Sequence, residues 1–244
     1  MRSTLRKRIG IVARDGVTAR PAGDPDCPLW IDGLTVSYGE KPAIFSVDAS
    51  FSPGRMTAIV GPNGAGKSTL IKAALGIVPR LSGAVQIFGQ PIDAVRERVA
   101  YVPQRASVDW DFPARVIDVV MMGLYRTLGF FRFAGQKERR RALACLQRVG
   151  MEDFAGRQIG QLSGGQQQRV AIARALAGEP RFLLADEPTG NLDSHMAMSV
   201  MELLSEINRN GTTIIMVTHD PALADMASRN VHILDGRVSD NGIV

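Results

Sequence analysis

Short apolar segments alternate with longer amphipathic segments along most of this chain. Runs or alternations of apolar side chains predict strands at 29–37, 47–51, 56–60, 84–88, 99–102, 181–185, 212–217 and 231–234. Apolar residues at helical spacing predict helices at 68–75, 117–124, 137–149, 165–177 and 196–209. Strands that alternate with helices are typical of an α/β fold with a largely parallel sheet.

The pattern changes between residues 105 and 161, where only helical spacing occurs. We therefore predict a helical subdomain at about 105–161, inserted into an α/β domain that covers 29–244. Segment 21–28, with the sequence PAGDPDCP, favours neither helix nor strand. Residues 1–28 are therefore predicted to be a basic, disordered N-terminal extension. No apolar run approaches the roughly 20 residues that cross a bilayer, so a membrane role would require a partner.

Charge and composition exclude several other classes of protein. The net charge is +5, but residues 1–28 contain six basic and three acidic side chains, which leaves about +2 for the rest. This balance is ordinary for a globular protein, and we predict no nucleic-acid partner. The two cysteines and three histidines have no spacing typical of a disulfide framework or a metal site.

A glycine-rich segment between a predicted strand and a predicted helix fits the phosphate-binding pattern G-x-x-x-x-G-K-[ST]. Glycines let backbone N–H groups converge on a phosphate, and the start of a helix adds partial positive charge there. In this pattern the lysine reaches the β- and γ-phosphates, and the serine coordinates Mg²⁺. The predicted nucleotide-binding residues of this loop are Gly61, Pro62, Asn63, Gly64, Ala65, Gly66, Lys67, Ser68 and Thr69.

Two adjacent carboxylates follow the predicted strand 181–185. A buried strand that ends in Asp186 and Glu187 is unfavourable without a positively charged partner, because desolvating an unpaired carboxylate is costly. A Mg²⁺ ion beside the phosphate loop would be such a partner: Asp186 suits the metal shell, and Glu187 can polarise the attacking water. The alternative is a solvated strand end, but a phosphate-binding loop in the same chain favours the metal site.

A second helix start with the features of an anion site lies at Leu162–Gln166, with the sequence LSGGQ. Ser163 can cap the helix predicted at 165–177, and the free backbone N–H groups of its first turn favour a phosphate. The predicted binding residues here are Ser163, Gly164, Gly165 and Gln166. This segment resembles the signature sequence of ATP-binding cassette (ABC) ATPases, and the resemblance extends over roughly residues 29–240.

Other short motifs resemble elements of that family in the expected order. Tyr38 resembles the aromatic residue that stacks on adenine. Gln104 resembles the glutamine that senses Mg²⁺ and links the core to the helical subdomain, which we also call the helical lobe. Asp193 resembles a residue of the dimer-contact loop, and His219 resembles the histidine that contacts the γ-phosphate and positions water. The resemblance implies that Lys67, Gln104, Glu187 and His219 are catalytic and that Ser68, Gln104 and Asp186 bind Mg²⁺.

The resemblance also implies a fold and an assembly. The fold is a P-loop NTPase core with a mostly parallel sheet, an N-terminal antiparallel β region and an inserted helical subdomain. Two copies pair head to tail, with each ATP between the Lys67 loop of one subunit and the Ser163 loop of the other. This homodimer, or a heterodimer with a similar chain, would drive a transmembrane permease from the cytoplasmic face of the inner membrane, as a peripheral subunit. A solute-binding protein would act through the same permease.

Different parts of the chain resemble different ABC subfamilies. Segments 101–113, 118–123 and 128–132 resemble importers of manganese, zinc or iron, whereas 184–194 and 212–220 resemble lipoprotein-releasing and macrolide exporters. Because the family contacts its membrane partner through the helical lobe, we predict import of a divalent metal, with export as the alternative. A non-transport ABC ATPase acting on a soluble partner is the alternative from another class.

The helical lobe is rich in aromatic residues. Aromatic side chains gather in partner-binding grooves, but they also fill the cores of small lobes. The sequence leaves both interpretations open for Trp110, Phe112, Phe130, Phe131 and Phe133.

Overall fold

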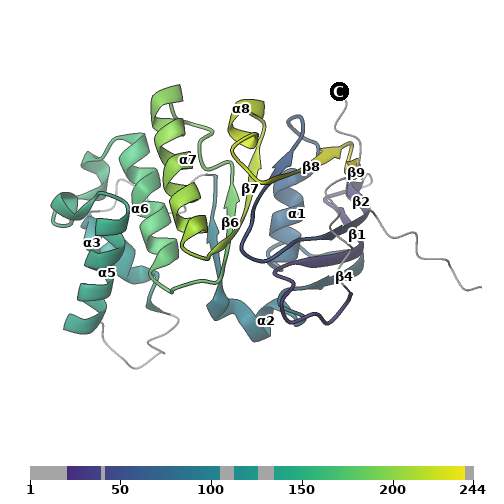
Figure 1. Cartoon of the computed structure of the whole chain (residues 1–244), viewed down its shortest axis with the longest axis horizontal. Helices are drawn as coiled ribbons and strands as arrows, with labels where there is room; N and C mark the ends of the chain where they lie inside the picture. Colours follow the sequence, from purple (N-terminus) through teal and green to yellow (C-terminus); the bar gives the residue numbers. More distant parts are fainter. Residues whose placement is uncertain (1–20, 40–41, 105–112, 126–134, 240–244) are drawn as a thin grey trace, which may run out of the picture.

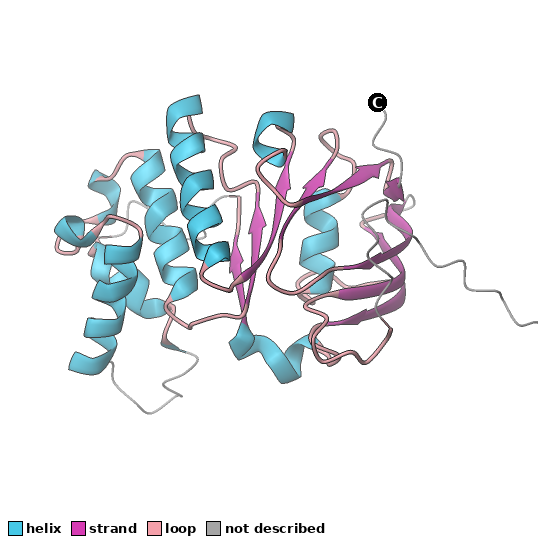
Figure 2. Ribbon diagram, viewed as in Figure 1, coloured by secondary structure: helices cyan, strands magenta, loops and turns pink. Residues whose placement is uncertain are grey.

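The computed structural model describes residues 21–39, 42–104, 113–125 and 135–239. Figure 2 shows its strands in magenta: β1 (Trp30–Ser37), β2 (Pro42–Ser50), β3 (Met56–Val60), β4 (Ser82–Gln86), β5 (Val99–Val102), β6 (Phe182–Asp186), β7 (Thr213–Thr218), β8 (Arg229–Leu234) and β9 (Arg237–Ser239). The helices are α1 (Lys67–Ala74), α2 (Ile92–Val95), α3 (Val116–Met122), α5 (Gln136–Arg148), α6 (Gly164–Leu176), α7 (Ser194–Arg209) and α8 (Pro221–Ala224). Three 3₁₀ turns join them: η1 (Arg96–Arg98), η2 (Glu152–Phe154) and η3 (Ile159–Gln161).

Every predicted strand and helix is present, with ends that differ by a few residues. The sequence does not predict α2, α8 or β9, which are too short to show a hydrophobic period. A three-stranded antiparallel sheet has the order β2-β1-β4, and a six-stranded sheet has the order β5-β6-β7-β3-β8-β9. Only β9 runs antiparallel in the larger sheet, so the predicted α/β class with a mostly parallel sheet is confirmed.

The six-stranded sheet is covered on both faces, as Figure 1 shows with α1 on one side and α6 and α7 on the other. Every residue of β6 and β7 is buried, which explains why both appear in the sequence as continuous apolar runs. Phe182 and Leu184 pack in the cluster that contains α1 and the small sheet, whereas Leu183 and Ala185 pack with α6 and α7. This burial fixes the carboxyl ends of β3, β6 and β7, where the candidate site residues lie.

Helices α3 and α5 lie within the predicted helical insertion and pack with α6 in one hydrophobic cluster. Figure 1 shows this helical lobe at the left of the molecule. Glu138 closes the start of α5, because its carboxylate accepts a hydrogen bond from the Gly135 backbone N–H at 2.8 Å. The aromatic residues Trp110, Phe112, Phe130, Phe131 and Phe133 lie outside the described residues.

Residues 21–28 form turns that pack against the folded unit. The Phe88 backbone N–H donates to the Cys27 carbonyl at 2.8 Å, and the Gly23 N–H donates to Gln86 Oε1 at 2.7 Å. The Cys27 side chain is 1% exposed. The predicted start of the folded unit at residue 29 is therefore too late, because Cys27 already belongs to the core. Residues 1–20 of the predicted extension lie outside the described part of the chain.

We expect Gly123→Ala to destabilise the packing of α3 on α6. A Cβ at Gly123 would lie 2.0 Å from the Arg174 carbonyl oxygen, and backbone cannot move aside as a flexible side chain can. Overpacking of this kind costs about 1–3 kcal/mol, and each kcal/mol lowers the Tm by about 2–4 °C in a chain of this size. Thermal unfolding followed by circular dichroism measures the change. Gly156→Ala is the control, since its Cβ would meet nothing within 4 Å; equal Tm values for both variants would contradict this packing.

Candidate functional site

The phosphate-binding loop joins β3 to α1 at the carboxyl end of β3. Gly64 and Gly66 have φ angles of 83° and 99°, which glycine adopts without strain. A Cβ on Gly61 would lie 2.1 Å from the Ile233 carbonyl oxygen, and a Cβ on Gly66 would lie 2.5 Å from the Ala43 carbonyl oxygen. Close approach of neighbouring backbone therefore requires glycine at both positions and keeps the loop wrapped around the start of α1.

Lys67 is buried inside this loop, with 4% of its surface exposed. Its ammonium Nζ donates to the Gly61 carbonyl oxygen at 2.8 Å and to the Pro62 carbonyl oxygen at 2.9 Å. Burial lowers the pKa of Lys67, and the charges of Glu187 and Asp186 raise it in opposition. Carbonyl oxygens do not neutralise a buried ammonium, so an anionic phosphate is the partner that this environment favours.

Asp186 is 1% exposed, and both of its carboxylate oxygens accept hydrogen bonds. Oδ1 accepts from Ser68 Oγ at 2.6 Å, and Oδ2 accepts from the Tyr101 hydroxyl at 3.2 Å. Burial raises the pKa of Tyr101, and the charge and hydrogen bond of Asp186 raise it further. The structure therefore brings together the two predicted ligands Ser68 and Asp186. It also places Tyr101 beside them, a residue that the sequence marks only as a side chain with a hydroxyl group in a short apolar strand.

Glu187 joins the two other predicted catalytic side chains. Its Oε2 accepts a hydrogen bond from Gln104 Nε2 at 2.8 Å and lies 3.6 Å from His219 Nδ1. The Glu187 backbone has a φ of 45°, in the left-handed region that costs a non-glycine residue about 1–2 kcal/mol. Its N–H donates to the Val217 carbonyl oxygen at 3.1 Å, which holds this turn against β7. The carboxylate is thereby aimed between Gln104 and His219.

The Ser163 loop has the predicted form of a capped helix start. Ser163 Oγ accepts from the Gln166 N–H at 3.4 Å, and Gln166 Oε1 accepts from the Ser163 N–H at 2.9 Å. A Cβ on Gly165 would meet Met196 Cε, the flexible end of a side chain of α7, so the start of α6 lies against α7. Asp193 caps α7, since its Oδ1 accepts from the Met196 N–H at 2.9 Å. The predicted Ser163 and Asp193 segments therefore lie side by side.

The structure does not bring all predicted residues to one point. Tyr38 follows β1 directly, and its side chain is 65% exposed. Across the described ranges, no hydrogen bond links Tyr38 or the Ser163 loop to the Lys67 loop. Within the described residues, the two predicted anion sites therefore lie at two different helix starts, that of α1 and that of α6.

Comparisons with known proteins identify the family. Residues 44–190 match the family model described as ABC transporter. The chain is 45% identical over 216 residues to the zinc transport system ATP-binding protein TroB of Treponema pallidum (strain Nichols), covering 88% of this chain and 81% of that protein. It is 46% identical over 198 residues to the manganese transport system ATP-binding protein MntB of Bacillus subtilis (strain 168), covering 81% and 79%.

A solved structure supports the same assignment. An ATP-binding cassette in a dimeric post-hydrolysis state, bound to ADP and Pi, has a TM-score of 0.72 and 32% sequence identity, covering 86% of this chain and 96% of that one. The family match includes the phosphate loop, the Ser163 loop and the acidic pair at the end of β6. The chain therefore belongs to the ABC transporter family, as an ATP-binding subunit.

Proposed function

We propose that this chain hydrolyses ATP to energise import of a divalent metal ion through a transmembrane permease. Membership of the ABC transporter family implies the permease partner and the pairing of two cassettes. The observation that carries the choice of cargo is the identity of 45% and 46% to ATP-binding proteins of a zinc and a manganese transport system. These relatives favour the importer interpretation of the helical lobe.

The residues beside the phosphate loop fit a Mg²⁺ ion. Mg²⁺ prefers hard oxygen ligands, and Ser68 Oγ and Asp186 Oδ1 present two of them 2.6 Å apart. The Gln104 side-chain amide offers a third oxygen, since its nitrogen is already engaged with Glu187. When bound there, Mg²⁺ would neutralise charge that develops on the β- and γ-phosphates. Ser68, Asp186 and Gln104 would hold it.

The remaining site residues have different roles in ATP binding and hydrolysis. Lys67 binds the phosphates, and the exposed Tyr38 ring stacks on the adenine base. Glu187 polarises the attacking water as general base. Gln104 and His219, which contact the same Glu187 oxygen, orient its carboxylate and the water. The strained backbone at Glu187 supports this assignment, because such strain is found where orientation matters.

The two anion-binding surfaces of one chain favour a dimer of the chain. The Ser163 helix start is polar and exposed at Ser163 and Gly164, and it presents free N–H groups. We infer that it binds the γ-phosphate of the ATP held by the Lys67 loop of a second copy, with Asp193 beside it at the contact. The related cassette that was solved in a dimeric state supports this arrangement.

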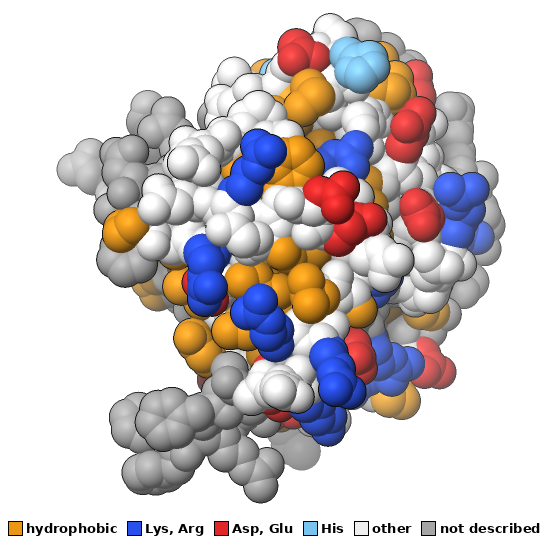
Figure 3. Space-filling model, turned by 90° about the vertical axis from the view of Figure 1, so that its left-hand side faces the viewer, with side chains coloured by type: hydrophobic (Ala, Val, Ile, Leu, Met, Phe, Trp, Pro, Cys, Tyr) orange, Lys and Arg blue, Asp and Glu red, His pale blue; other side chains and the backbone are white. Residues whose placement is uncertain are grey.

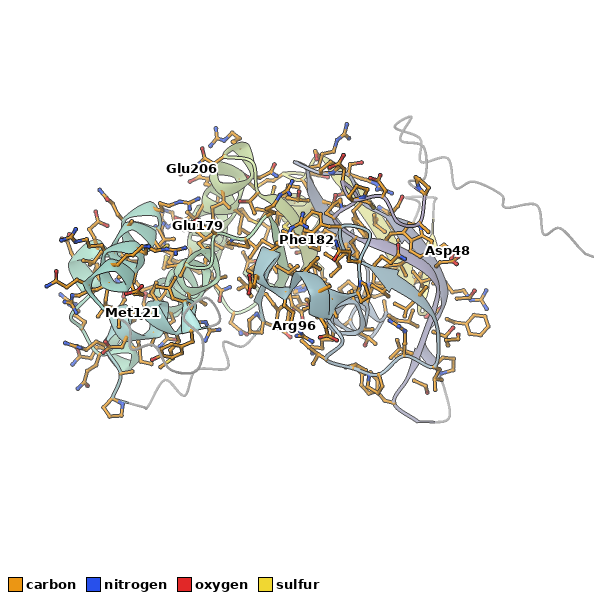
Figure 4. The ribbon with its side chains drawn as sticks, turned by 90° about the horizontal axis from the view of Figure 1, so that it is seen from below. Asp48, Arg96, Met121, Glu179, Phe182 and Glu206 are labelled. Carbon is orange, nitrogen blue, oxygen red and sulfur yellow. The ribbon has the colours of Figure 1, made fainter. Side chains whose placement is uncertain are left out.

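A cavity of about 460 Å³ supplies the surface on which the permease would dock. It lies between the α/β core and the helical lobe, and its apolar lining comes from Leu75, Ile77, Ile92, Val99, Met122 and Ala175. Three charged side chains also line the cavity, those of Arg96, Glu97 and Arg174. Figure 4, seen from below, shows Arg96 to the right of the helical lobe. On the lobe side of the molecule, Figure 3 shows hydrophobic side chains gathered between Lys and Arg side chains. A permease segment with an apolar face fits this surface.

The attachment to the membrane would be peripheral. Within the described ranges, no helix has the length and apolar character needed to cross a membrane. The permease would hold the subunit at the cytoplasmic face of the cell membrane, where ATP is available. A solute-binding protein would present the metal to the permease on the other side.

Cell-associated manganese, zinc and iron test this proposal in the native host under metal limitation. Replacing the wild type with Glu187→Gln should lower one of the three metals, because import stops when hydrolysis stops. Glu206→Gln is the matched control, since Glu206 is an exposed residue of α7. In the described part of the chain, its side chain has no hydrogen bond or ion pair with the candidate site. Unchanged levels of all three metals in the Glu187→Gln strain would overturn metal import.

Export is the second candidate function. Segments 184–194 and 212–220, which contain Glu187 and His219, resemble the lipoprotein-releasing and macrolide exporters. These segments serve the ATP chemistry that all family members share, so they say less about cargo than the lobe does. Unchanged metals together with membrane sedimentation that depends on a co-expressed permease would favour export. Sedimentation that never depends on a permease would favour an ATPase with a soluble partner.

A further inference from the structure

Tyr101 lies on β5, at the edge of the six-stranded sheet. It pairs in register with Leu184 of β6, and it packs against the cluster that contains Leu184 and α1. Asp186 is two positions beyond Leu184, so its side chain leaves β6 on the same face of the sheet. A tyrosine ring is long enough to span this diagonal, and its hydroxyl donates to Asp186 Oδ2 at 3.2 Å.

This hydrogen bond has a consequence for the orientation of Asp186. A carboxylate at a strand end can turn about its terminal torsion, which has a broad range of allowed angles. The Tyr101 hydroxyl engages Oδ2, and Oδ1 is left facing Ser68 Oγ at 2.6 Å. The proposed metal-binding oxygens of Ser68 and Asp186 are therefore directed toward each other by a donor on the opposite side of the carboxylate.

The ring of Tyr101 is not held by packing on every side. It lines the cavity of about 460 Å³ between core and lobe, and it is only partly buried. The hydroxyl therefore has a specific partner, whereas part of the ring borders open space. A role in filling the core explains such a residue less well than a role in holding Asp186.

We propose that Tyr101 is a positioning residue of the ATPase site, whose hydroxyl fixes the Asp186 carboxylate in the orientation that binds Mg²⁺. The inference rests on the proposed function, which makes Asp186 a metal ligand. Groups that orient a metal ligand in this way typically change metal affinity or activity by about 10–100-fold when they are removed. Tyr101→Phe removes the hydroxyl and keeps the ring, so it isolates this contribution.

The test titrates a fluorescent ATP analogue into the purified full chain, once in the presence of Mg²⁺ and once in the presence of EDTA. We expect Tyr101→Phe to weaken binding about tenfold in Mg²⁺ and to leave binding in EDTA unchanged. The Mg²⁺ concentration that half-saturates hydrolysis should rise by a similar factor, with a smaller change in kcat at saturating Mg²⁺. Tyr125→Phe, the same chemical change at a side chain that is 56% exposed, should change neither value.

The Asp186→Asn variant separates an effect of Tyr101 that acts through Asp186 from an effect on the site that does not involve Asp186. If Tyr101 acts through Asp186, adding Tyr101→Phe to Asp186→Asn should cause no further loss. Equal losses in Mg²⁺ and EDTA, or wild-type behaviour of Tyr101→Phe, would overturn the inference while leaving the proposed function intact. A wild-type protein whose binding ignores Mg²⁺ would instead overturn the metal site itself, and the inference with it.

Discussion

Glu187→Gln is expected to lower the rate of ATP hydrolysis by a factor of about 10²–10⁴, the usual contribution of a general base, and to trap an ATP-bound dimer. Glutamine has nearly the same shape but cannot accept a proton. The φ of 45° and the backbone bond to Val217 place the side chain at this position, and neither depends on the carboxylate. Two ATP molecules should then bind and stay bound, because the step that releases the dimer is blocked.

Light scattering in excess ATP measures the trapped dimer, and phosphate release measures hydrolysis. The wild type should return to monomer as ATP is consumed, whereas Glu187→Gln should remain dimeric. Glu206→Gln removes a charge from the exposed face of α7 and should behave as the wild type. A Glu187→Gln protein that is folded and yet monomeric in excess ATP would show that Glu187 does not have the proposed role.

Lys67→Ala is expected to abolish nucleotide binding at micromolar concentrations. The ammonium is buried and already held by the Gly61 and Pro62 carbonyl oxygens, so it needs little rearrangement to meet phosphate. Hydrogen bonds to charged groups contribute about 1.5–3 kcal/mol each, and this lysine is expected to contact two phosphates. The combined loss corresponds to about a 100-fold or larger drop in affinity.

Equilibrium titration with a labelled ATP analogue measures this loss. Lys72→Ala is the matched control, because Lys72 has the same charge and lies in the last turn of the same helix. Its affinity should stay close to that of the wild type. Submicromolar binding by Lys67→Ala would show that the loop does not bind phosphate through this residue.

Local sequence patterns were sufficient to predict the longer helices and strands, though not α2, α8 or β9, and to name most of the candidate site residues. The phosphate loop, the acidic pair and the Ser163 helix start are each defined by a few consecutive residues, and each depends only on the strand or helix beside it. The buried strands β6 and β7 were equally clear, because residues covered on both faces form apolar runs. Family resemblance then assigned roles to Tyr38, Gln104 and His219, whose patterns alone are common in folded cores.

Contacts between distant residues required the tertiary structure. Ser68 and Asp186 are 118 positions apart, and Tyr101 and Asp186 are 85 apart, so no local spacing predicts either hydrogen bond. The same is true of Cys27 in the core and of Gly123 against Arg174. The sequence determined the chemistry available to this protein through short motifs that specify their own backbone. Only the tertiary structure decided which side chain orients Asp186, because that depends on how β5 and β6 pair and on which face their side chains share.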